Sequence, residues 1–286
     1  MKKGLSMLLI IVMAALVFAG CGAKEASETS KPAESETTLT GTLSIAGSTT
    51  VAPPAQALAD AFEARYPETR VDVQGIGSSA GMKMLNEGGC EIGMASRQLK
   101  QKELDWGLEP IAIAFDGIAL VVHPSNDISD LTKEEIQKIF MGQITNWSEV
   151  GGADEEILVV SREDGSGTRG AFEEILKLDG DQGSMVVENA LIAEGNGAVK
   201  ANIASKSQAI GYISLGIVDE TVKALLVDGA QATVENIKSN VYGVSRPLNM
   251  ATKGETSELA RAYLDFVMSP EGQKIVAEHY IPVVGE

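Results

Sequence analysis

The sequence predicts an α/β protein in which mostly parallel strands alternate with helices. The pattern is clearest in three units, each running from a short strand through a turn rich in Gly, Ser and Thr into a helix. The three strands are residues 42–46, 70–73 and 157–160. Residues 41–286 make a chain that is large for a single hydrophobic core, so we expect two lobes.

Hydrophobic periodicity and breaker residues place the remaining elements. In the helix expected at about 53–66, for example, Leu58, Ala61 and Phe62 share one apolar face. A long apolar run at 111–122 is broken at Asp116 and predicts a strand near the junction of the lobes. Further helices are expected at 132–140, 169–178, 186–205 (with an interruption at 195–197), 257–268 and 270–279, and further strands at 91–94, 210–213 and 241–244.

The N-terminus has the composition of an export signal. Two lysines precede the apolar run 7–18, and Ala19-Gly20-Cys21 follows it. Small residues directly before a cysteine resemble a bacterial lipobox, although Phe18 departs from the usual leucine. We therefore expect a signal peptide at 1–20, then a lipidated Cys21 and a disordered linker at 21–40. A plain signal peptide or an uncleaved anchor is the alternative.

Charge and cysteine content exclude several classes of function. The formal net charge of −17 leaves no basic surface for nucleic acid. Two cysteines and two histidines cannot make a Cys/His metal cluster, and we expect no metal and no cofactor. Cys90 lies in an apolar context and is expected to be a small buried side chain.

The turns that follow the three strands predict a binding site for a small anion. They carry Ser48 and Thr49, then Ser78 and Ser79, then the run 162–168 with its arginine. Each turn also opens a helix, whose first N–H groups have no internal partner and lie at the positive end of the helix dipole. Open α/β sheets bind ligands at the carboxyl ends of their strands, so these donors can surround one tetrahedral anion.

Enzymatic readings fit the sequence poorly. A serine hydrolase needs a base beside its nucleophile, and neither His123 nor His279 has a clear partner. Asp164 stands at the first glycine position of a nucleophile elbow, and the Gly-Lys-Ser/Thr of a P-loop is missing. We expect no catalytic residues and a protein that is not an enzyme.

Several of these motifs together resemble the extracytoplasmic phosphate-binding proteins of ABC-type phosphate importers, the PstS family. The motifs are residues 46–50, 74–81, 162–168, 210–214 and 266–273, and the resemblance spans nearly the whole chain after the leader. It implies a type II periplasmic-binding-protein fold, with two lobes of mostly parallel sheets and a ligand cleft between them. One lobe would comprise 41–118 plus 240–286, and the other 119–239.

The resemblance also implies which residues bind phosphate. The expected ligands are Thr49, Ser78, Arg162, Ser166, Gly167 and Thr168, with Ser48, Ser79, Ser96 and Asp116 as further candidates. Asp164 is expected to pair with Arg162 and hold its guanidinium. Members of the family place an aspartate after a Gly-Ala-Ser strand end to accept the phosphate proton. This chain has Ser96 and Arg97 there, and we nominate Asp116 as the replacement.

The expected partners are inorganic phosphate, the membrane subunits of the importer and, through Cys21, the lipid bilayer at the extracytoplasmic face of a bacterial membrane. Two alternatives stay open: a binding protein for another tetrahedral oxyanion such as sulfate or molybdate, and a surface or adhesion lipoprotein without a transport role.

Overall fold

The structure is a computed structural model that describes residues 39–284. The expected signal peptide, Cys21 and nearly all of the expected linker lie outside the described residues. Within residues 39–284, no helix has both the length and the apolar character needed to cross a membrane.

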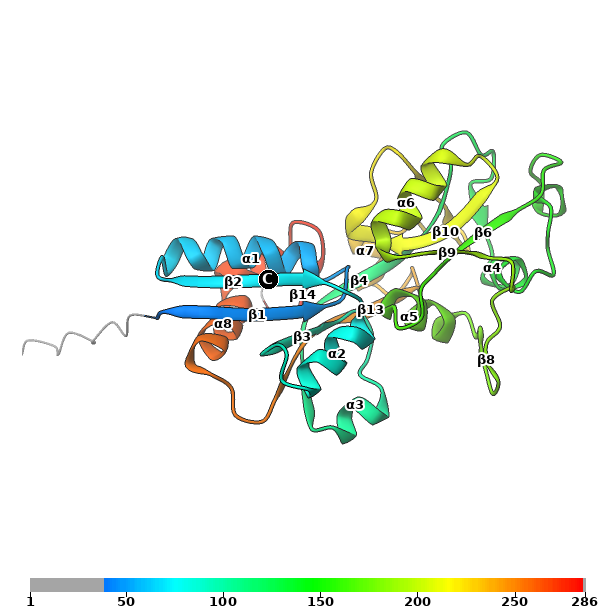
Figure 1. The fold of residues 1–286 in the computed structure, drawn as a ribbon. Helices are drawn as coiled ribbons and strands as arrows, with labels where there is room; N and C mark the ends of the chain where they lie inside the picture. The colour runs from blue at the N-terminus through cyan, green and yellow to red at the C-terminus, as the bar shows by residue number, and fades with distance from the viewer. Residues whose placement is uncertain (1–38, 285–286) are drawn as a thin grey trace, which may run out of the picture. The chain divides into compact units, whose positions relative to one another are not determined.

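A mixed sheet runs through the described part of the chain (Figure 1). Its main path has the order β2-β1-β3-β13-β4-β10-β6-β9, and β11 and β14 also pair with β4. Strands β1–β2, β1–β3, β6–β9 and β6–β10 pair in parallel, whereas β4 and β13 run antiparallel to their neighbours. The strands are β1 (Gly41–Gly47), β2 (Thr69–Gly75), β3 (Ile92–Ala95), β4 (Leu108–Val122), β6 (Leu158–Arg162), β9 (Leu191–Ala193), β10 (Ala209–Ser214), β11 (Lys223–Ala224), β13 (Ser245–Lys253) and β14 (Ile281–Pro282).

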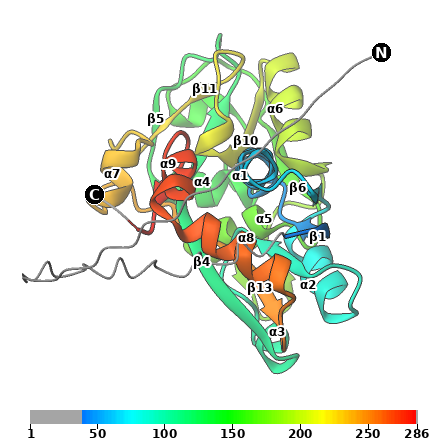
Figure 2. The ribbon, with the colours of Figure 1, turned by 90° about the vertical axis from the view of Figure 1, so that its left-hand side faces the viewer.

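Helices flank each half of this sheet. The half formed by β1, β2 and β3 carries α1 (Ala52–Arg65), α2 (Ser78–Asn86), α3 (Gln101–Asp105), α8 (Glu258–Met268) and α9 (Pro270–Val276). Figure 2 looks toward this half, with α8 and α9 near the viewer and α1 seen along its axis. The half with β6, β9 and β10 carries α4 (Lys133–Phe140), α5 (Gly167–Ile175), α6 (Gly195–Ser205) and α7 (Val234–Lys238).

Short elements complete the second half. They are two small sheets, β5 (Asp130–Leu131) with β12 (Leu226–Val227) and β7 (Asp179–Gly180) with β8 (Gly183–Ser184), and the 3₁₀ turns Trp147–Val150 and Leu215–Ile217.

Each half has its own buried apolar cluster. In the first, Phe62 of α1 packs edge-on against Tyr263 of α8, with ring centroids 5.4 Å apart. In the second, Phe172 of α5 stacks on Tyr212 of β10 at 3.9 Å. These aromatic contacts lie within larger clusters of aliphatic side chains. The α/β fold class predicted from the strand–turn–helix units is therefore confirmed.

Strand β4 connects the two halves. Its residues 108–117 pair with β13, and its residues 118–122 pair with β10. Nearly every side chain from Ile113 to Val122 is buried, because this stretch lies against apolar clusters on both sides of the crossing. The apolar run broken at Asp116 thus forms one continuous strand, with that aspartate at the crossing.

Two predicted elements are wrong. The helix expected over 186–205 begins only at Gly195, because residues 191–193 pair in parallel with β6 as β9. The strand expected at 241–244 is absent from the described chain, and β13 begins at Ser245. The N–H groups of Val241 and Tyr242 donate instead to the Asn236 carbonyl at the end of α7. At 191–193 pairing with a distant strand overrides the local apolar pattern, and at 241–242 backbone contacts with α7 take the place of strand pairing.

Candidate functional site

The turns after β1, β2 and β6 meet where the two halves face each other. The N–H of Ser79, at the start of α2, donates to the Gly165 carbonyl in the turn after β6, at 3.0 Å. The guanidinium of Arg162, the last residue of β6, donates to the Thr49 hydroxyl in the turn after β1, at 3.3 Å. The carboxyl ends of these strands therefore bring together residues more than 80 positions apart in the chain.

The turn after β6 presents the start of α5 to this meeting point. The Ser166 hydroxyl caps the helix by accepting from the Arg169 N–H at 3.2 Å. Gly165 has φ = 85°, a conformation that glycine adopts without strain. No acceptor among the described residues takes a hydrogen bond from the N–H of Gly167 or Thr168. These two amides and the helix dipole are suited to bind an anion.

Gly167 leaves the room that the facing serines need. A Cβ on Gly167 would overlap the Ser78 hydroxyl and come within 2.6 Å of the Ser96 hydroxyl. Ser78 and Ser96 are both almost fully buried, and the Ser78 hydroxyl accepts from the Ser96 N–H at 3.2 Å. The two serines of the first half therefore lie directly against the first turn of α5.

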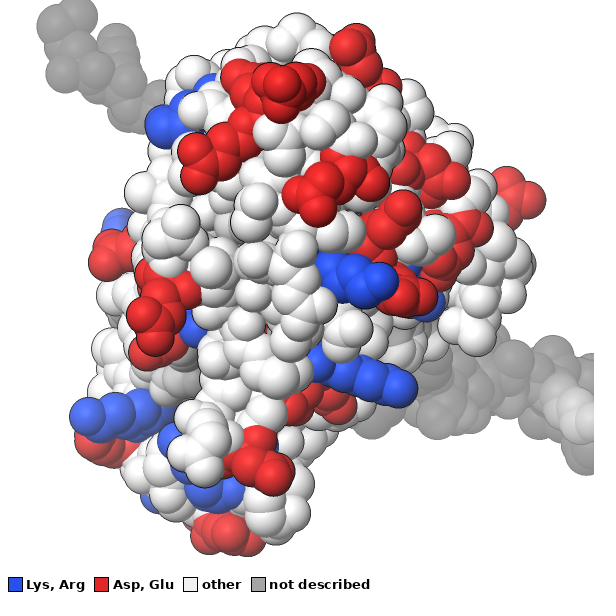
Figure 3. Space-filling model, turned by 90° about the vertical axis from the view of Figure 1, so that its right-hand side faces the viewer, with Lys and Arg blue, Asp and Glu red and all other residues white. Residues whose placement is uncertain are grey.

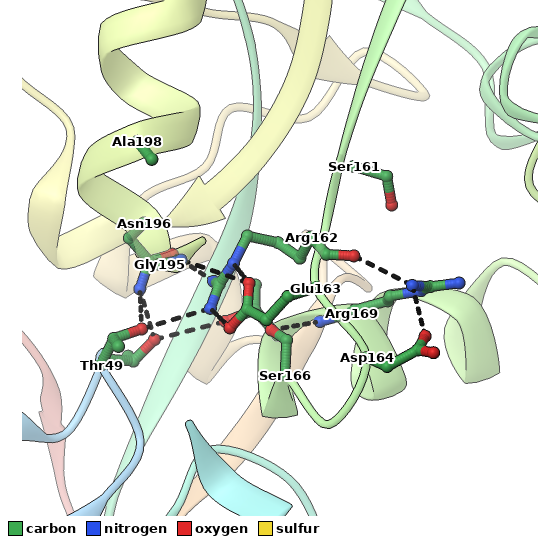
Figure 4. Close-up of polar contacts among 12 residues, drawn as sticks. Thr49, Ser161, Arg162, Glu163, Asp164, Ser166, Arg169, Gly195, Asn196 and Ala198 are labelled. Carbon is green, nitrogen blue, oxygen red and sulfur yellow. Dashed lines mark hydrogen bonds and ion pairs between the residues drawn. The ribbon is translucent and has the colours of Figure 1, made fainter. Parts of the chain in front are cut away.

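Arg162 is held from several sides (Figure 4). Its side chain is 1% exposed, and its Nε and Nη2 donate to the Glu163 carboxylate at 2.7 and 2.8 Å. Its Nη1 donates to the Asn196 side-chain oxygen at 3.2 Å. Burial tends to raise the pKa of Glu163, but the Arg162 pair and the Gly195 N–H outweigh it and hold that pKa below its usual range.

The expected pairing of Asp164 with Arg162 is wrong. The Asp164 side chain is 98% exposed and pairs with Arg169 at 2.8 Å. Asp164 lies at the outer tip of the turn, where only the next turn of α5 reaches its carboxylate. Glu163 lies one residue closer to the strand and faces the cleft, so it takes the role predicted for Asp164.

Three residues that the sequence reasoning did not select join the site: Thr50, Asn196 and Arg246. Asn196, 2% exposed, donates to Thr50 Oγ1 at 2.9 Å and to Thr49 Oγ1 at 3.3 Å. It belongs to the first turn of α6, so β9 and α6 form a fourth strand–turn–helix unit. In the sequence, the Gly-Asn-Gly run 195–197 indicates the turn of this fourth unit. The unit was not recognised because β9 has only three residues.

Asp116 faces Arg246 across neighbouring strands. The two residues are register partners on β4 and β13, and Arg246 Nη2 lies 2.9 Å from Asp116 Oδ2. Both side chains are about 1% exposed. Burial raises the pKa of the Asp116 carboxyl, and the positive charge of Arg246 opposes that rise. Arg246 Nη2 also donates to the Thr50 hydroxyl at 3.1 Å.

Two of the further candidate serines hold the backbone of the turns. The Ser48 hydroxyl accepts from the N–H groups of Thr50 and Val51. The Ser79 hydroxyl accepts from Arg97 Nη2 at 3.0 Å, and Arg97 forms a bidentate pair with Glu103 at 2.8 Å. Arg97 therefore supports the start of α2.

The site combines neutral hydrogen-bond donors, which are hydroxyls and backbone amides, with two arginines. Arg162 and Arg246 each pair with one carboxylate, Glu163 and Asp116. Within residues 39–284, no group of His, Cys, Asp and Glu side chains could hold a metal ion. Acidic side chains predominate on the upper part of the face in Figure 3, and the formal net charge of the chain is −17, so long-range attraction does not draw an anion in. Binding of an anion has to come from the local donors of the cleft.

Comparisons with known proteins agree with this geometry. A family model described as a PBP superfamily domain matches residues 32–271. The "Phosphate-binding protein PstS" of Bacillus subtilis (strain 168) is 33% identical over 295 residues, covering 99% of this chain and 95% of that protein.

Solved structures extend the likeness. A putative phosphate ABC transporter substrate-binding protein from Clostridium perfringens, solved with bound phosphate, has a TM-score of 0.83 and 46% identity, and the match covers 85% of this chain and all of that one. An ABC-type phosphate transport receptor from Vibrio cholerae has a TM-score of 0.72 and 38% identity over the same shares.

Proposed function

This chain belongs to the PstS family of phosphate-binding proteins, and from that premise we propose that it binds inorganic phosphate outside the cytoplasm and delivers it to the membrane subunits of an ABC-type importer. It is a binding protein and not an enzyme. The proposal depends mainly on one observation: the turns after three strands meet near Arg162. Glu163 holds the guanidinium of Arg162 in place. The proposed ligands are Thr49, Ser78, Arg162, Ser166, Gly167 and Thr168.

Phosphate suits this donor set because its oxygens accept from several directions. The amides of Gly167 and Thr168 and the hydroxyls of Thr49 and Ser78 come from different elements on opposite sides of the cleft. A guanidinium adds the charge that a dehydrated anion needs. Neither side of the cleft alone supplies all of these donors.

Selection of phosphate over sulfate requires an acceptor for the phosphate proton. We keep Asp116 as the candidate, since its Oδ1 has no hydrogen-bond partner among the described residues, whereas Glu163 already accepts from Arg162 and Gly195. Sulfate carries no proton at neutral pH, so a buried carboxylate beside it would be unpaired and repulsive.

A calorimetric titration of the mature protein with phosphate, arsenate, sulfate and molybdate tests the function. We expect phosphate and arsenate to bind and sulfate to be rejected, by as much as about 10⁴-fold if the site is built around one hydroxyl. A preference for sulfate or molybdate would favour the alternative of a binding protein for another oxyanion. If no oxyanion bound, the adhesion alternative would remain.

The Asp116→Asn variant tests the selector. An unchanged ratio of phosphate affinity to sulfate affinity would show that Asp116 does not select phosphate.

The proposed lobes are residues 41–118 with 240–286, and residues 119–239. Two apolar clusters on the two sides of the β4 crossing support two lobes, but Tyr242, Val244 and Ile281 pack in the cluster of the second half. Because the donors are divided between the lobes, we propose that the lobes close over the anion. Small-angle scattering should show a smaller radius of gyration with phosphate than without it. Equal radii would contradict a ligand-driven closure.

We also propose that Cys21 carries a lipid that holds the protein at the extracytoplasmic face of a bacterial membrane. The motivation is the run Ala19-Gly20-Cys21 after a short apolar stretch. Fractionation of cells that express Cys21→Ala should move the protein from the membrane to the medium, or leave an uncleaved precursor. A mature, membrane-bound variant would refute the anchor without touching the binding proposal.

A further inference from the structure

Three buried side-chain atoms in the described chain have no hydrogen-bond partner: Asp116 Oδ1, Ser214 Oγ and Arg246 Nη1. The unpaired nitrogen is the most demanding of the three. An ionised guanidinium that is 1% exposed loses its hydration, and each N–H left without an acceptor destabilises the fold. Arg246 Nη1 therefore has hydrogens that it can donate to a ligand.

The geometry of the guanidinium indicates on which side that ligand lies. The edge formed by Nε and Nη2 faces Asp116 Oδ2, at 3.3 and 2.9 Å. A guanidinium is planar, so the edge formed by Nη2 and Nη1 faces a second direction. On that edge, Nη2 donates to Thr50 Oγ1 at 3.1 Å. Nη1 therefore points to the same side as the turn after β1.

Thr50 connects this edge to the anion-binding turn of the other half. Its Oγ1 lies 2.9 Å from Asn196 Nδ2 and 3.4 Å from Thr168 Oγ1. A hydroxyl has two lone pairs and one hydrogen. Arg246 and Asn196 occupy both lone pairs of Thr50, so its hydrogen is directed to Thr168. The Thr168 hydroxyl then accepts from Thr50 and has its own hydrogen free for a ligand.

The same reasoning applies to Thr49. Its Oγ1 accepts from Arg162 Nη2 and from Asn196 Nδ2, both at 3.3 Å, which also fills both lone pairs. The amide of Asn196 is oriented by its oxygen, which faces two donors, Arg162 Nη1 and the Ser214 N–H. The two arginines and Asn196 thus leave Thr49 and Thr168 with hydrogens to donate.

We infer that Arg246 is a second guanidinium of the anion site, which donates from Nη1 to the bound anion and orients the Thr168 hydroxyl through Thr50, with Asp116 as its counter-ion. The inference rests on the proposed oxyanion function and assigns a further residue to it. The ligand class is a tetrahedral oxyanion, and two arginines with one carboxylate partner each leave the site neutral before the ligand enters.

The test compares Asp116→Asn with the double variant Asp116→Asn/Arg246→Gln in calorimetric titrations with phosphate. The Asp116 carboxylate is absent from both proteins, so their difference isolates the guanidinium. The double variant should bind phosphate about 10- to 100-fold more weakly than the single one, as expected for a lost charge-assisted hydrogen bond. The double variant has two neutral side chains at these positions, whereas the single variant leaves the charge of Arg246 buried and unpaired. The double variant should therefore unfold at a higher temperature.

Equal dissociation constants in two cooperatively folded variants would overturn the inference and make Arg246 a purely structural partner of Asp116. If the single variant does not fold, Arg246→Lys replaces it, because lysine keeps the charge but lacks the planar guanidinium. Wild-type affinity of that variant would also overturn the inference.

The matched control is Tyr242→Phe, which removes a buried hydrogen bond to the Ile118 carbonyl at the same crossing. This variant should keep wild-type affinity. Wild-type protein that binds no oxyanion would sink the proposed function itself.

Discussion

Arg162 forms its ion pair with the adjacent residue, Glu163, through two contacts of 2.7 and 2.8 Å. The two residues stand at the end of β6, and their side chains point toward one another. The pair leaves Arg162 Nη1 and one side of Nη2 to face Asn196 and Thr49. A guanidinium whose position is fixed by Glu163, Asn196 and Thr49 is pre-organised for an anion.

Removal of this fork should have the largest effect of any single charge change. In Arg162→Ala, phosphate binding should weaken by about 2–5 kcal/mol, the range measured when one partner of a buried charge pair is truncated. Arg162→Lys should recover only part of the loss, because an ammonium cannot form the same two parallel hydrogen bonds. Calorimetry on variants with unchanged circular dichroism provides the measurement, and near-normal affinity of the alanine variant would contradict the assignment.

Glu163 and its neighbour Asp164 provide a matched pair of substitutions. In Glu163→Gln, one amide NH₂ meets the guanidinium as a second donor, so the fork turns and affinity should fall about tenfold. In Asp164→Asn, only an exposed contact with Arg169 changes, and affinity should stay within about twofold, as for most surface ion pairs. The reverse order of effects in phosphate titrations would restore Asp164 as the partner of Arg162.

Gly167 should be required for closure of the cleft. In Gly167→Ala the added methyl group overlaps the Ser78 hydroxyl, while alanine favours the helix that begins there, so binding should fail in a folded protein. Gly197→Ala serves as the control, because a Cβ at that helical position meets only open space. Binding that survives in Gly167→Ala would show that the halves separate enough to admit the methyl group.

The buried pair of Arg97 and Glu103 predicts a dependence of stability on pH. Burial tends to raise the pKa of Glu103, but its bonds to Arg97 and to the Lys100 N–H hold that pKa below the ordinary value of about 4.3. A depressed carboxyl pKa stabilises the fold above the unfolded-state value. This contribution disappears as the pH falls through the folded-state pKa.

Glu103→Gln isolates that contribution. At neutral pH the variant should lose about 3–5 kcal/mol of unfolding free energy, since Arg97 stays buried without its counter-charge. The gap between wild type and variant should narrow as the pH falls below the ordinary glutamate value of about 4.3, because the wild-type carboxyl is protonated as the pH passes its lower folded-state pKa. Urea denaturation at several pH values measures both, and a gap that is constant with pH would refute the pair's role.

The local chemistry of the three turns could be predicted from the sequence. Hydroxyl caps, glycines and helix starts are properties of a few consecutive residues, and the motifs around Thr49, Ser78 and Ser166 carry them. The family resemblance inferred from those motifs is confirmed by relatives and solved structures. Both wrong elements, at 186–193 and 241–244, are short apolar stretches whose periodicity does not separate helix, strand and packed loop.

Only the tertiary structure shows which side chains of the site pair with each other. Whether Arg162 meets Glu163 or Asp164 depends on which way two adjacent side chains leave a turn, and composition does not specify that direction. Thr50, Asn196 and Arg246 lie on three distant segments, and only the folding of the whole chain brings them within hydrogen-bonding distance. The sequence by itself therefore determined which groups could bind an anion. The fold decided which of them share one cleft, because long-range packing sets those distances.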